Sequence, residues 1–513
     1  MDKQLDLKVV IVGGGFGGLG MGVALKKAGI DSFAIVEKGG DVGGVWRENT
    51  YPGCSCDVPS HLYSFSFAPY RSAKTRYPSQ ERILAYLRGV ADTYDLLPHL
   101  RLHTTVVEAS YREDIARWEL TTGTGEHIVA DLLVFAVGQL HRRYVPDIPG
   151  REDFTGAAFH SAHWDHRQNL RGRDVAVVGT GSSAGQLLPK IAADARTVTV
   201  YQRTPHWVLP KPAAEFGAIS RWVLRMPGAH RLYRQALYYG ADIALAPIVH
   251  RGWSARPAHW LARIHLRRHV SDPALRAALT PDYPIGSKRI VFDSRFHSTL
   301  GRENVELVTD PIARITRNGI ETGDGTHRRA DVIVWATGFR ASEFLTPMTV
   351  RGRGGRLLRE QWSDGAEAFL GLAVPGFPNA FLIAGPNSFN PAGSNPGMKE
   401  RQIAYIMACL RWRDAIGAPA IEVSGDAMRQ YRQWLERAIA KTVWPAAGAS
   451  WYKHEKGRVT NPWPASARTF ARMLHHHPAA AFVPVAANDA APVTPLPIHR
   501  HPPTHDEATP TAS

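Results

Sequence analysis

Short apolar runs and helix-forming stretches follow one another along the chain in an order that occurs twice. The apolar run at residues 9–12 leads into the glycine-rich segment GGGFGGLG, a helix-forming stretch and a second apolar run at 32–36. The run at 175–178 leads in the same way into GTGSSAGQ, a helix-forming stretch and a run at 197–201. A strand, a glycine turn, a helix and a parallel strand make a βαβ unit, so the pattern predicts two such units.

The remaining stretches predict the rest of the secondary structure. Apolar runs predict strands at residues 105–109, 118–121, 132–135, 290–292, 305–308 and 331–335, and longer stretches predict helices at 79–91, 399–413 and 425–443. Residues 216–270 hold nine arginines and a single acid, Asp242, among helix formers and aromatic residues, which predicts an inserted helical subdomain. Beyond residue 477 alanine, proline, threonine and histidine follow without periodicity, which predicts a disordered tail.

The composition excludes several classes of protein. Hydrophobic residues make up 44% and charged residues 21% of the 513 residues, which is typical of globular proteins. Cys54, Cys56 and Cys409 are the three cysteines; they are too few for a disulfide framework and lack metal-ligand spacing. We therefore expect a reducing compartment, the cytoplasm, and no metal site. We expect neither a secretory signal nor a membrane span, because the start MDKQLDL and the later apolar stretches do not fit either.

The charge balance is the unusual bulk property. The net charge is +15, and such a field attracts nucleic acid, acidic lipids or phosphorylated cofactors. The sequence shows no helix-turn-helix, zinc-finger or RNA-binding motif, so we expect no nucleic-acid partner. Polyanionic cofactors account for part of the basic excess.

The first glycine turn fits a dinucleotide. Gly13, Gly15 and Gly18 have the GxGxxG spacing. The first glycine permits a tight turn, the second lets a pyrophosphate approach the backbone and the third lets the helix pack on the strand. The N-terminus of the helix then attracts phosphate. Glu37 ends the second strand, where an acid can accept hydrogen bonds from unphosphorylated ribose hydroxyls.

The second glycine turn differs at the end of its second strand. Gly179 and Gly181 repeat the spacing, but Arg203 and Thr204 stand where the first unit has Glu37. A guanidinium binds a 2′-phosphate in a forked geometry, whereas a carboxylate repels it. The two units together predict FAD in the first site and NADPH in the second, the combination of a flavoprotein that nicotinamide reduces.

Two longer motifs make the chain similar to a known family. The segment FTGAAFHSAHWD matches the fingerprint FxGxxxHxxxW, ending in Pro or Asp, of type I Baeyer–Villiger monooxygenases. Its fixed positions are Phe154, Gly156, His160, Trp164 and Asp165. The segment GGVWRENTYPGCSCD, residues 43–57, resembles the second fingerprint of that family. The resemblance covers about residues 7–464, and it implies that the chain is a member of this family.

The resemblance implies roles for several residues. It makes Arg289 the catalytic residue and Asp57 the active-site carboxylate that orients it. It implies that Lys288, with Arg203 and Thr204, contacts the 2′-phosphate of NADPH. Trp451 would lie near bound NADP. His160 would lie on the linker between the domains, away from the flavin, where it couples domain motion to turnover.

The same matching assigns further positions to the cofactors, with Trp46 and Tyr63 against the flavin. The full set of these positions is Phe16, Lys38, Gly44, Val45, Trp46, Cys56, Tyr63, Val106, Thr180, Ser182, Ser183 and Gln186.

The implied activity is the insertion of one oxygen atom of O2 next to a ketone carbonyl through a C4a-peroxyflavin, giving an ester or lactone. A permanently charged guanidinium suits this reaction, because it stabilises an oxyanion without supplying a labile proton. Two alternatives remain open at this point. One is an N- or S-oxygenase on the same scaffold, and the other is a non-catalytic basic protein with a nucleotide-binding fold.

The fold class expected from these patterns is α/β, with two Rossmann-type domains for FAD and NADPH and an inserted helical subdomain. The expected boundaries are 1–145 and 374–475 for the FAD-binding domain, 166–210 and 284–373 for the NADPH-binding domain, 146–165 for the fingerprint linker, 211–283 for the insert and 476–513 for the tail. The expected partners are a small ketone and O2, with no obligate protein partner. The arginine-rich insert is expected to make a weak peripheral contact with a membrane.

Overall fold

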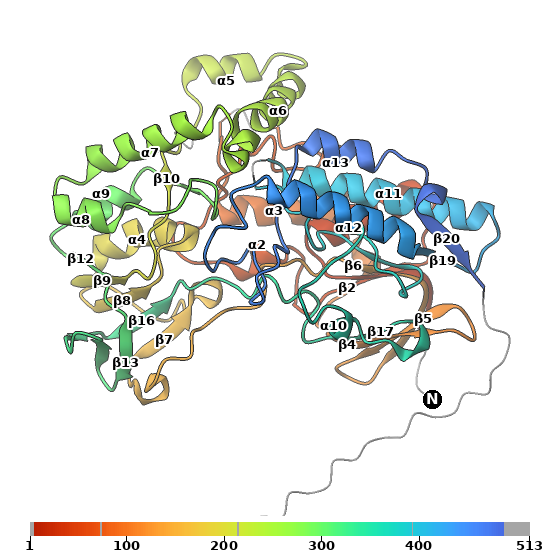
Figure 1. Cartoon of the computed structure of the whole chain (residues 1–513), viewed down its shortest axis with the longest axis horizontal. Helices are drawn as coiled ribbons and strands as arrows, with labels where there is room; N and C mark the ends of the chain where they lie inside the picture. Colours follow the sequence, from red (N-terminus) through yellow and green to blue (C-terminus); the bar gives the residue numbers. More distant parts are fainter. Residues whose placement is uncertain (1–4, 72–73, 213–214, 392, 487–513) are drawn as a thin grey trace, which may run out of the picture.

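The computed structural model of the chain describes residues 5–71, 74–212, 215–391 and 393–486. Two α/β units lie side by side, each built on a sheet with a parallel core, and a helical layer covers one end of the molecule (Figure 1). The predicted fold class, with two Rossmann-type units and a helical insert, is confirmed.

The first unit has an eight-stranded sheet. Its parallel strands are β3 (Leu100–Arg101), β2 (Phe33–Val36), β1 (Leu5–Val12), β6 (His127–Phe135) and β18 (Ala380–Leu382). An antiparallel meander continues from β6 through β5 (Arg117–Thr122) to β4 (Val106–Arg112), and β17 (Thr349–Arg351) pairs with β4. The helices are α1 (Phe16–Lys27), α2 (Val45–Glu48), α3 (Gln80–Thr93), α10 (Leu358–Gln361), α11 (Asn395–Ala415), α12 (Gly425–Ala440) and α13 (Ala467–Met473).

The second unit has a five-stranded sheet in which every pairing is parallel. Its order is β12 (Val305–Val308), β9 (Thr197–Tyr201), β8 (Asp174–Val178), β16 (Val332–Trp335) and β7 (Ala157–His160). Helices α4 (Ser182–Asp194) and α9 (Phe296–Leu300) accompany it. Smaller sheets pair β10 (Val208–Leu209) with β11 (Val291–Phe292), and β13 (Ile312–Thr316), β14 (Gly319–Thr322) and β15 (His327–Arg329) with one another.

The two glycine turns have the same geometry. Gly13 has φ +111° and Gly179 has φ +110°, in the region that favours glycine. A Cβ atom on Gly13 would lie 2.6 Å from the carbonyl oxygen of Ala136, and one on Gly179 would lie 2.5 Å from that of Ala336. In both units the backbone therefore excludes any side chain at the first glycine, and each turn leads directly into its helix.

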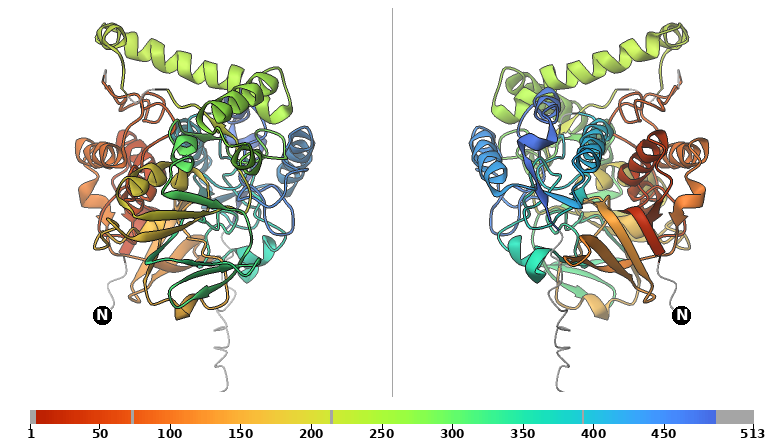
Figure 2. Two further views of the ribbon diagram at one scale, coloured as in Figure 1. Left: turned by 90° about the vertical axis from the view of Figure 1, so that its left-hand side faces the viewer. Right: turned by 90° about the vertical axis from the view of Figure 1, so that its right-hand side faces the viewer.

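The insert is helical, as predicted. It contains α5 (Ala218–Leu224), α6 (Ala229–Gly240) continued by a π-helical turn (Ala241–Leu245), α7 (Ala255–His269) and α8 (Pro273–Ala278). Three side chains of the insert are buried in the core of the second unit. They are Leu266 of α7, Val270 directly after α7 and Leu279 after α8. α5 and α6 stand out at the top of the molecule in both views of Figure 2.

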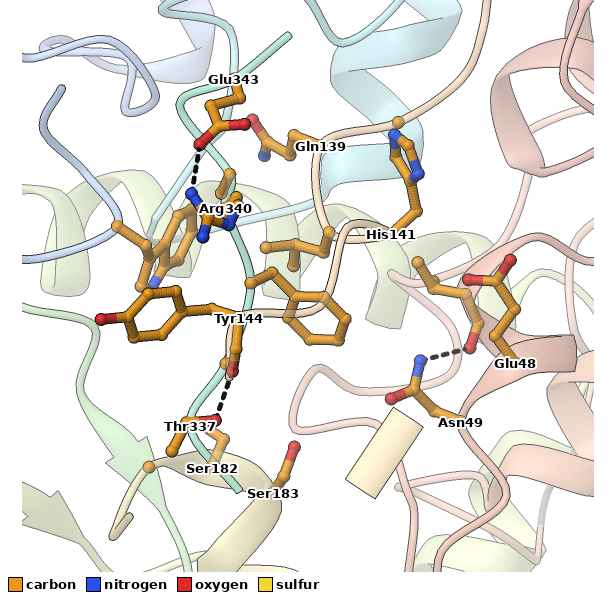
Figure 3. A pocket seen from close by; sticks show the side chains of 18 of the residues that line it. Glu48, Asn49, Gln139, His141, Tyr144, Ser182, Ser183, Thr337, Arg340 and Glu343 are labelled. Carbon is orange, nitrogen blue, oxygen red and sulfur yellow. Dashed lines mark hydrogen bonds and ion pairs between the residues drawn. The ribbon is translucent and has the colours of Figure 1, made fainter. Parts of the chain in front are cut away.

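Two segments connect the units and pair with each other. Residues 138–148 lead out of the first unit and 336–343 lead back towards it. The backbone N–H of Tyr144 donates to the carbonyl oxygen of Gly338 at 2.9 Å, and an antiparallel bridge joins Arg143 to Phe339. Figure 3 shows the two segments running together beside the pocket. This ribbon is the paired connection between the two units.

His160 joins this ribbon to the second sheet. Its Nδ1 accepts a hydrogen bond from the N–H of Ala162, so the proton lies on Nε2, which donates to the carbonyl oxygen of Gly338; both distances are 3.0 Å. The side chain is buried. Burial lowers the pKa of His160 to about 4, so the ring is neutral near pH 7.

Three expected boundaries need correction. β17, at residues 349–351, pairs with β4 of the first sheet, so the chain returns to the first unit before residue 349 rather than at 374. Residues 157–160 of the expected linker form β7, the edge strand of the second sheet. In the expected tail, β20 (Phe482–Val485) pairs with β19 (Ala420–Val423). Each is a short edge strand, whose few apolar residues give no periodicity to detect. Residues 487–513 of the expected tail lie outside the described part of the chain.

Replacing Phe482 by Ala should lower the free energy of unfolding by about 3 kcal/mol, because the side chain is buried among Phe381, Phe369 and Tyr405 and its loss leaves a cavity. Chemical denaturation measures the change. Val483→Ala is the matched control, since Val483 is 42% exposed, and it should cause little change. Equal, small effects of both substitutions would contradict the packing of this strand.

Stability should fall as the pH is lowered from 6.5 towards 4, in part because of His160. The unfolded chain binds a proton at this histidine in that range, whereas the native ring, with its lowered pKa, does not. The expected slope is about 1.4 kcal/mol per pH unit for one such group. Melting temperatures at pH 7 and pH 5 should differ less for His160→Gln than for wild type. The exposed His475→Gln should keep the wild-type difference; a wild-type difference in His160→Gln would refute the assignment.

Candidate active site

A large cavity lies where the carboxyl ends of the two parallel sheets meet. Its volume is about 1240 Å³, and it is lined by the ends of β1, β2, β8, β9 and β16. In open α/β sheets ligands bind outside the carboxyl ends of the strands. The cavity is therefore in the expected place for ligands of both units at once.

The predicted cofactor residues converge on this cavity. All of them line the cavity except Gly18. Gly18 packs against the backbone of the preceding turn: a Cβ atom on it would lie 1.9 Å from the carbonyl oxygen of Gly13. That is the helix–strand contact expected of the third glycine. Residues predicted from many separate segments of the chain thus lie around one cavity.

Backbone alone lines the first phosphate-binding turn. Gly44 has φ +54°, and a Cβ atom on it would lie 3.3 Å from the Cα atom of Gly15. Gly15 and Phe16 begin α1 and line the cavity, so the helix N-terminus faces it. The two glycine backbones approach each other closely beside the positive end of a helix, and neither glycine has a side chain that would obstruct a pyrophosphate there.

Glu37 stands at the end of β2 beside this turn. Its Oε2 accepts a hydrogen bond from the N–H of Gly14 at 2.7 Å, and its Oε1 accepts from the N–H of Gly39 at 2.8 Å. Arg47 pairs with Oε1 at 2.9 Å. The carboxylate is buried and fixed in direction by these contacts, and it still borders the cavity, where it can accept ribose hydroxyls.

Asp57 and Arg289 form an ion pair across the two units. Nη2 of Arg289 lies 2.9 Å and 2.7 Å from the two carboxylate oxygens of Asp57. Burial by itself raises the pKa of Asp57, but Arg289 and Lys211 outweigh it and hold that pKa below its usual value. Burial works against the charge of Arg289 too, and Asp57 outweighs it, so the pKa of Arg289 is raised. Both groups are charged in the cavity near neutral pH.

Aromatic rings border the same end of the cavity. The guanidinium of Arg289 lies 5.5 Å from the ring centre of Phe389, which is packed edge-on against Trp451 at 5.1 Å. The indole N–H of Trp46 donates to the hydroxyl of Tyr63 at 3.1 Å. Flat apolar walls around one fixed cation fit a flat ring system and an apolar substrate.

Arg203 and Lys288 form a basic corner in the second unit. Both line a side pocket of about 350 Å³ that adjoins the main cavity, together with Thr204. Burial lowers the pKa of Lys288, and the nearby Arg203 lowers it further, because the two cations repel each other. Neither makes an ion pair with any residue that the structure describes. Two neighbouring cations without a counter-charge, one exposed and one half-buried, favour an anion between them.

The side-chain amide of Gln186, expected to contact a cofactor, makes hydrogen bonds to residues of the first unit. Its Oε1 accepts hydrogen bonds from the hydroxyl of Tyr51 at 2.9 Å and the N–H of Ser55 at 3.1 Å, and its Nε2 donates to the carbonyl oxygen of Ser55 at 3.0 Å. The side-chain amide of Gln186, on α4, therefore joins the second unit to the loop that carries Asp57. Gln186 borders the cavity, but its polar atoms act between the units.

The first fingerprint lies behind the cavity rather than in its lining. A Cβ atom on Gly156 would lie 2.4 Å from the carbonyl oxygen of Asp331 and 2.6 Å from the ring of Phe154, so only glycine fits. Trp164 packs edge-on against Phe159 at 5.0 Å, and Asp165 accepts hydrogen bonds from Arg167. Together with His160 these residues shape the connection between the units.

Sequence reasoning missed two lysines. Lys211 donates to the carbonyl oxygen of Cys56 at 2.9 Å, beside Asp57, and follows β10 in the chain. Lys399, in the first turns of α11, lines the cavity, and burial lowers its pKa to about 8. Lys399 stands in a helix-forming stretch that reads as an ordinary solvent-facing helix, so no signal in the sequence marked it.

Comparisons with known proteins agree with this geometry. Residues 10–223 match the family described as pyridine nucleotide-disulphide oxidoreductase. A Baeyer–Villiger monooxygenase of Streptomyces coelicolor is 39% identical, over 91% of this chain and 90% of its own. One of Pseudomonas aeruginosa is 37% identical, over 93% of this chain and 91% of its own.

The fold is similar to those of solved structures as well. A steroid monooxygenase bound to NADP has a TM-score of 0.83 at 30% identity, with 94% of this chain and 99% of that chain covered. Cyclohexanone monooxygenase in a closed crystal structure has a TM-score of 0.84 at 27% identity, with 94% and 100% covered. OTEMO in complex with FAD and NADP has a TM-score of 0.85 at 26% identity, with 93% and 99% covered. With identities of 37% and 39% over about nine tenths of the chain, the chain belongs to the Baeyer–Villiger monooxygenase family.

Proposed function

We propose that Arg289 is the catalytic residue of a ketone monooxygenase and that Asp57 is the residue that positions it. As a Baeyer–Villiger monooxygenase, the chain is an FAD- and NADPH-dependent enzyme that inserts one oxygen atom of O2 next to a ketone carbonyl, giving an ester or lactone. The observation that carries the assignment is the Asp57–Arg289 ion pair inside the cavity shared by both units.

The residues around the cavity fit both cofactors. FAD would lie along the first unit, with its pyrophosphate at the Gly13 turn, its ribose at Glu37 and its flavin beside Trp46 and Tyr63. NADPH would lie along the second unit, with its pyrophosphate at the Gly179 turn. The basic corner of Arg203, Thr204 and Lys288 would hold the 2′-phosphate. When bound, the two cofactors supply the hydride that reduces the flavin and the activation of O2.

Arg289 acts on the charge that develops in the reaction. Its guanidinium can donate hydrogen bonds to an oxygen that becomes negative when a carbonyl carbon is attacked. Because arginine stays protonated, it stabilises that oxygen without losing a proton to it. The contact with Asp57 uses Nη2, which leaves the other nitrogens of the fork available to the reacting oxygen.

Asp57 and its neighbours hold Arg289 in place. Asp57 lies on the loop of the first unit that Gln186 joins to the second unit, and Lys211 binds the adjacent carbonyl oxygen of Cys56. Rotation of the units about the connecting ribbon would move these contacts together. We therefore assign His160, which binds the ribbon at Gly338, a positioning role in that motion.

The two alternative activities are less well supported. An N- or S-oxygenase on this scaffold needs no fixed pair of carboxylate and guanidinium at the reacting end of the cavity, whereas this chain has one. A non-catalytic protein with the same fold needs no intact motifs at both turns, and both are intact here. Oxidation of sulfur as a side activity remains compatible with the proposal.

The proposed substrates are a small ketone and O2, in line with the apolar wall around Arg289. The cytoplasm stays the predicted compartment, from the cysteine count; all three cysteines are buried free thiols. In the described part of the chain no helix has the length and apolar character to cross a bilayer. A peripheral contact of the insert with a membrane surface remains part of the proposal.

Arg289→Ala should lower the rate of ester formation at least about 100-fold, because the developing negative oxygen loses its cation. FAD content and thermal stability measured on the same preparation separate this effect from misfolding. Arg302→Ala removes an exposed arginine of the same unit and is the control. Ketone oxygenation at nearly the wild-type rate in Arg289→Ala would exclude the catalytic role.

Arg203→Ala should lower kcat/KM for NADPH about 10- to 100-fold and leave kcat/KM for NADH almost unchanged, because only NADPH carries the phosphate that the guanidinium binds. Flavin reduction followed with each cofactor in turn measures both values. Arg317→Ala, also in the second unit and exposed, should change neither. An equal loss with both cofactors would show that Arg203 is structural.

A further inference from the structure

Exposed apolar side chains are concentrated on the insert. Among the described residues, fifteen large hydrophobic side chains are exposed, and ten of them lie between residues 219 and 261. They are Ile219, Trp222, Val223, Met226, Leu232, Tyr239, Ile243, Trp253, Trp260 and Leu261. Such a concentration of exposed apolar side chains in one part of a folded protein indicates a binding surface.

The first part of this surface is a stripe of apolar side chains along α5 and the turn that follows it. Ile219, Trp222, Val223 and Met226 follow the spacing i, i+3, i+4, i+7, which puts them on one face. In a water-soluble helix that face is buried against the core. Here Ile219 is 81% and Trp222 is 63% exposed, while Leu224 is the buried residue of the helix. The helix therefore presents its apolar face to the outside.

α6 is bound to the protein through polar contacts. Nδ1 of His230 lies 2.9 Å from Nε2 of His61 in the first unit, and Nη1 of Arg234 donates to the carbonyl oxygen of His61 at 2.5 Å. On the other side of the helix Leu232 is 70% exposed, and Tyr239 is also exposed. These polar contacts thus hold α6 in place and leave Leu232 and Tyr239 facing outward.

The surface is also basic and lacks counter-charges. Of the nine arginines between residues 216 and 270, Arg234 pairs with Glu400 at 3.8 Å. The other eight, Arg221, Arg225, Arg231, Arg251, Arg256, Arg263, Arg267 and Arg268, make no ion pair within the described residues. The single acid of this segment, Asp242, is used elsewhere: it accepts hydrogen bonds from the N–H groups of Ala467 and Arg468 at the start of α13, at 2.9 and 3.2 Å.

We propose that α5, α6 and the exposed residues of α7 form a docking surface for an anionic lipid bilayer. Apolar and tryptophan side chains would enter the interface, and the arginines around them would contact lipid phosphates. This inference rests on the membrane contact named in the proposed function and gives it a defined surface. The surface lies at one end of the molecule, where α5 and α6 stand out from the rest of the chain (Figure 2).

Charge distinguishes a bilayer from a second copy of the chain. Two copies meeting through this surface would bring their unpaired arginines together, and like charges at an interface oppose association. An anionic bilayer supplies opposite charge over the whole patch. Each arginine near such a surface adds to the attraction, so a set of this size can support reversible binding with shallow insertion.

The insert also reaches the cavity. Val249, after α6, is packed in one cluster with Phe389 and Trp451, which border the aromatic end of the cavity beside Arg289. Its carbonyl oxygen accepts a hydrogen bond from the N–H of Val443 at 2.8 Å. One short insert therefore connects the bilayer surface to the place where an apolar ketone would react.

Co-sedimentation of the FAD-loaded protein with vesicles tests the surface. Vesicles of equal parts phosphatidylcholine and phosphatidylglycerol should bind the protein at least about tenfold more strongly than phosphatidylcholine alone, and added salt should release it. Ile219→Ser combined with Trp222→Ser, and Arg225→Gln combined with Arg231→Gln, should each weaken binding about tenfold. Leu97→Ser combined with Ile416→Ser removes apolar residues of the first unit that are also exposed, at 55% and 45%, and should change nothing.

The outcomes separate this surface from the enzymatic proposal. FAD content and turnover of a water-soluble ketone should be the same in all these variants, because none of the residues lines the cavity. Absence of vesicle binding, or equal binding by wild type and the α5 variant, would overturn the surface and leave the activity intact. A dimer in solution that the α5 variant dissolves, without vesicle binding, would assign the surface to a second copy instead. Vesicle binding by a protein that oxygenates no ketone would retain the surface and overturn the proposed activity.

Discussion

The proposed active site depends on two opposite charges that come from different units and meet in one cavity. Asp57 belongs to a loop of the first unit, and Arg289 precedes β11 of the second. Removing one partner of this partly buried pair leaves the other charge uncompensated, so the pair links the units as well as setting the direction of the guanidinium. Gln186 and Lys211 support the same loop with neutral and charge-assisted hydrogen bonds.

Because the Asp57–Arg289 pair spans both units, its geometry depends on the connections between them. If the units rotate, the distance between Asp57 and Arg289 changes, and the cavity opens or closes around its contents. The ribbon of residues 138–148 and 336–343 connects the units, and His160 binds the ribbon at Gly338. The proposed role of this fingerprint histidine is therefore to position the units from a distance, without contact to the reacting atoms.

Much of this was predictable from the sequence, for physical reasons. Glycines with positive φ, such as Gly13 and Gly179, mark turns that tolerate no other residue, and their spacing identifies the nucleotide sites. Short edge strands such as β17 and β20 carry too few residues for a period, so the boundary at 374 and the start of the tail were placed wrongly. Lys399 and the hydrogen bonds of Gln186 depend on tertiary packing, which no local pattern records.

The central claim is that this cavity transfers an oxygen atom from O2 to a ketone. The most direct measurement supplies the purified, FAD-loaded protein with NADPH, isotope-labelled O2 and a panel of cyclic and linear ketones, and analyses the products by mass spectrometry. The account predicts an ester or lactone that carries one labelled oxygen atom for each NADPH consumed. Consumption of NADPH with an equal amount of H2O2, and no labelled ester from any ketone, would contradict it.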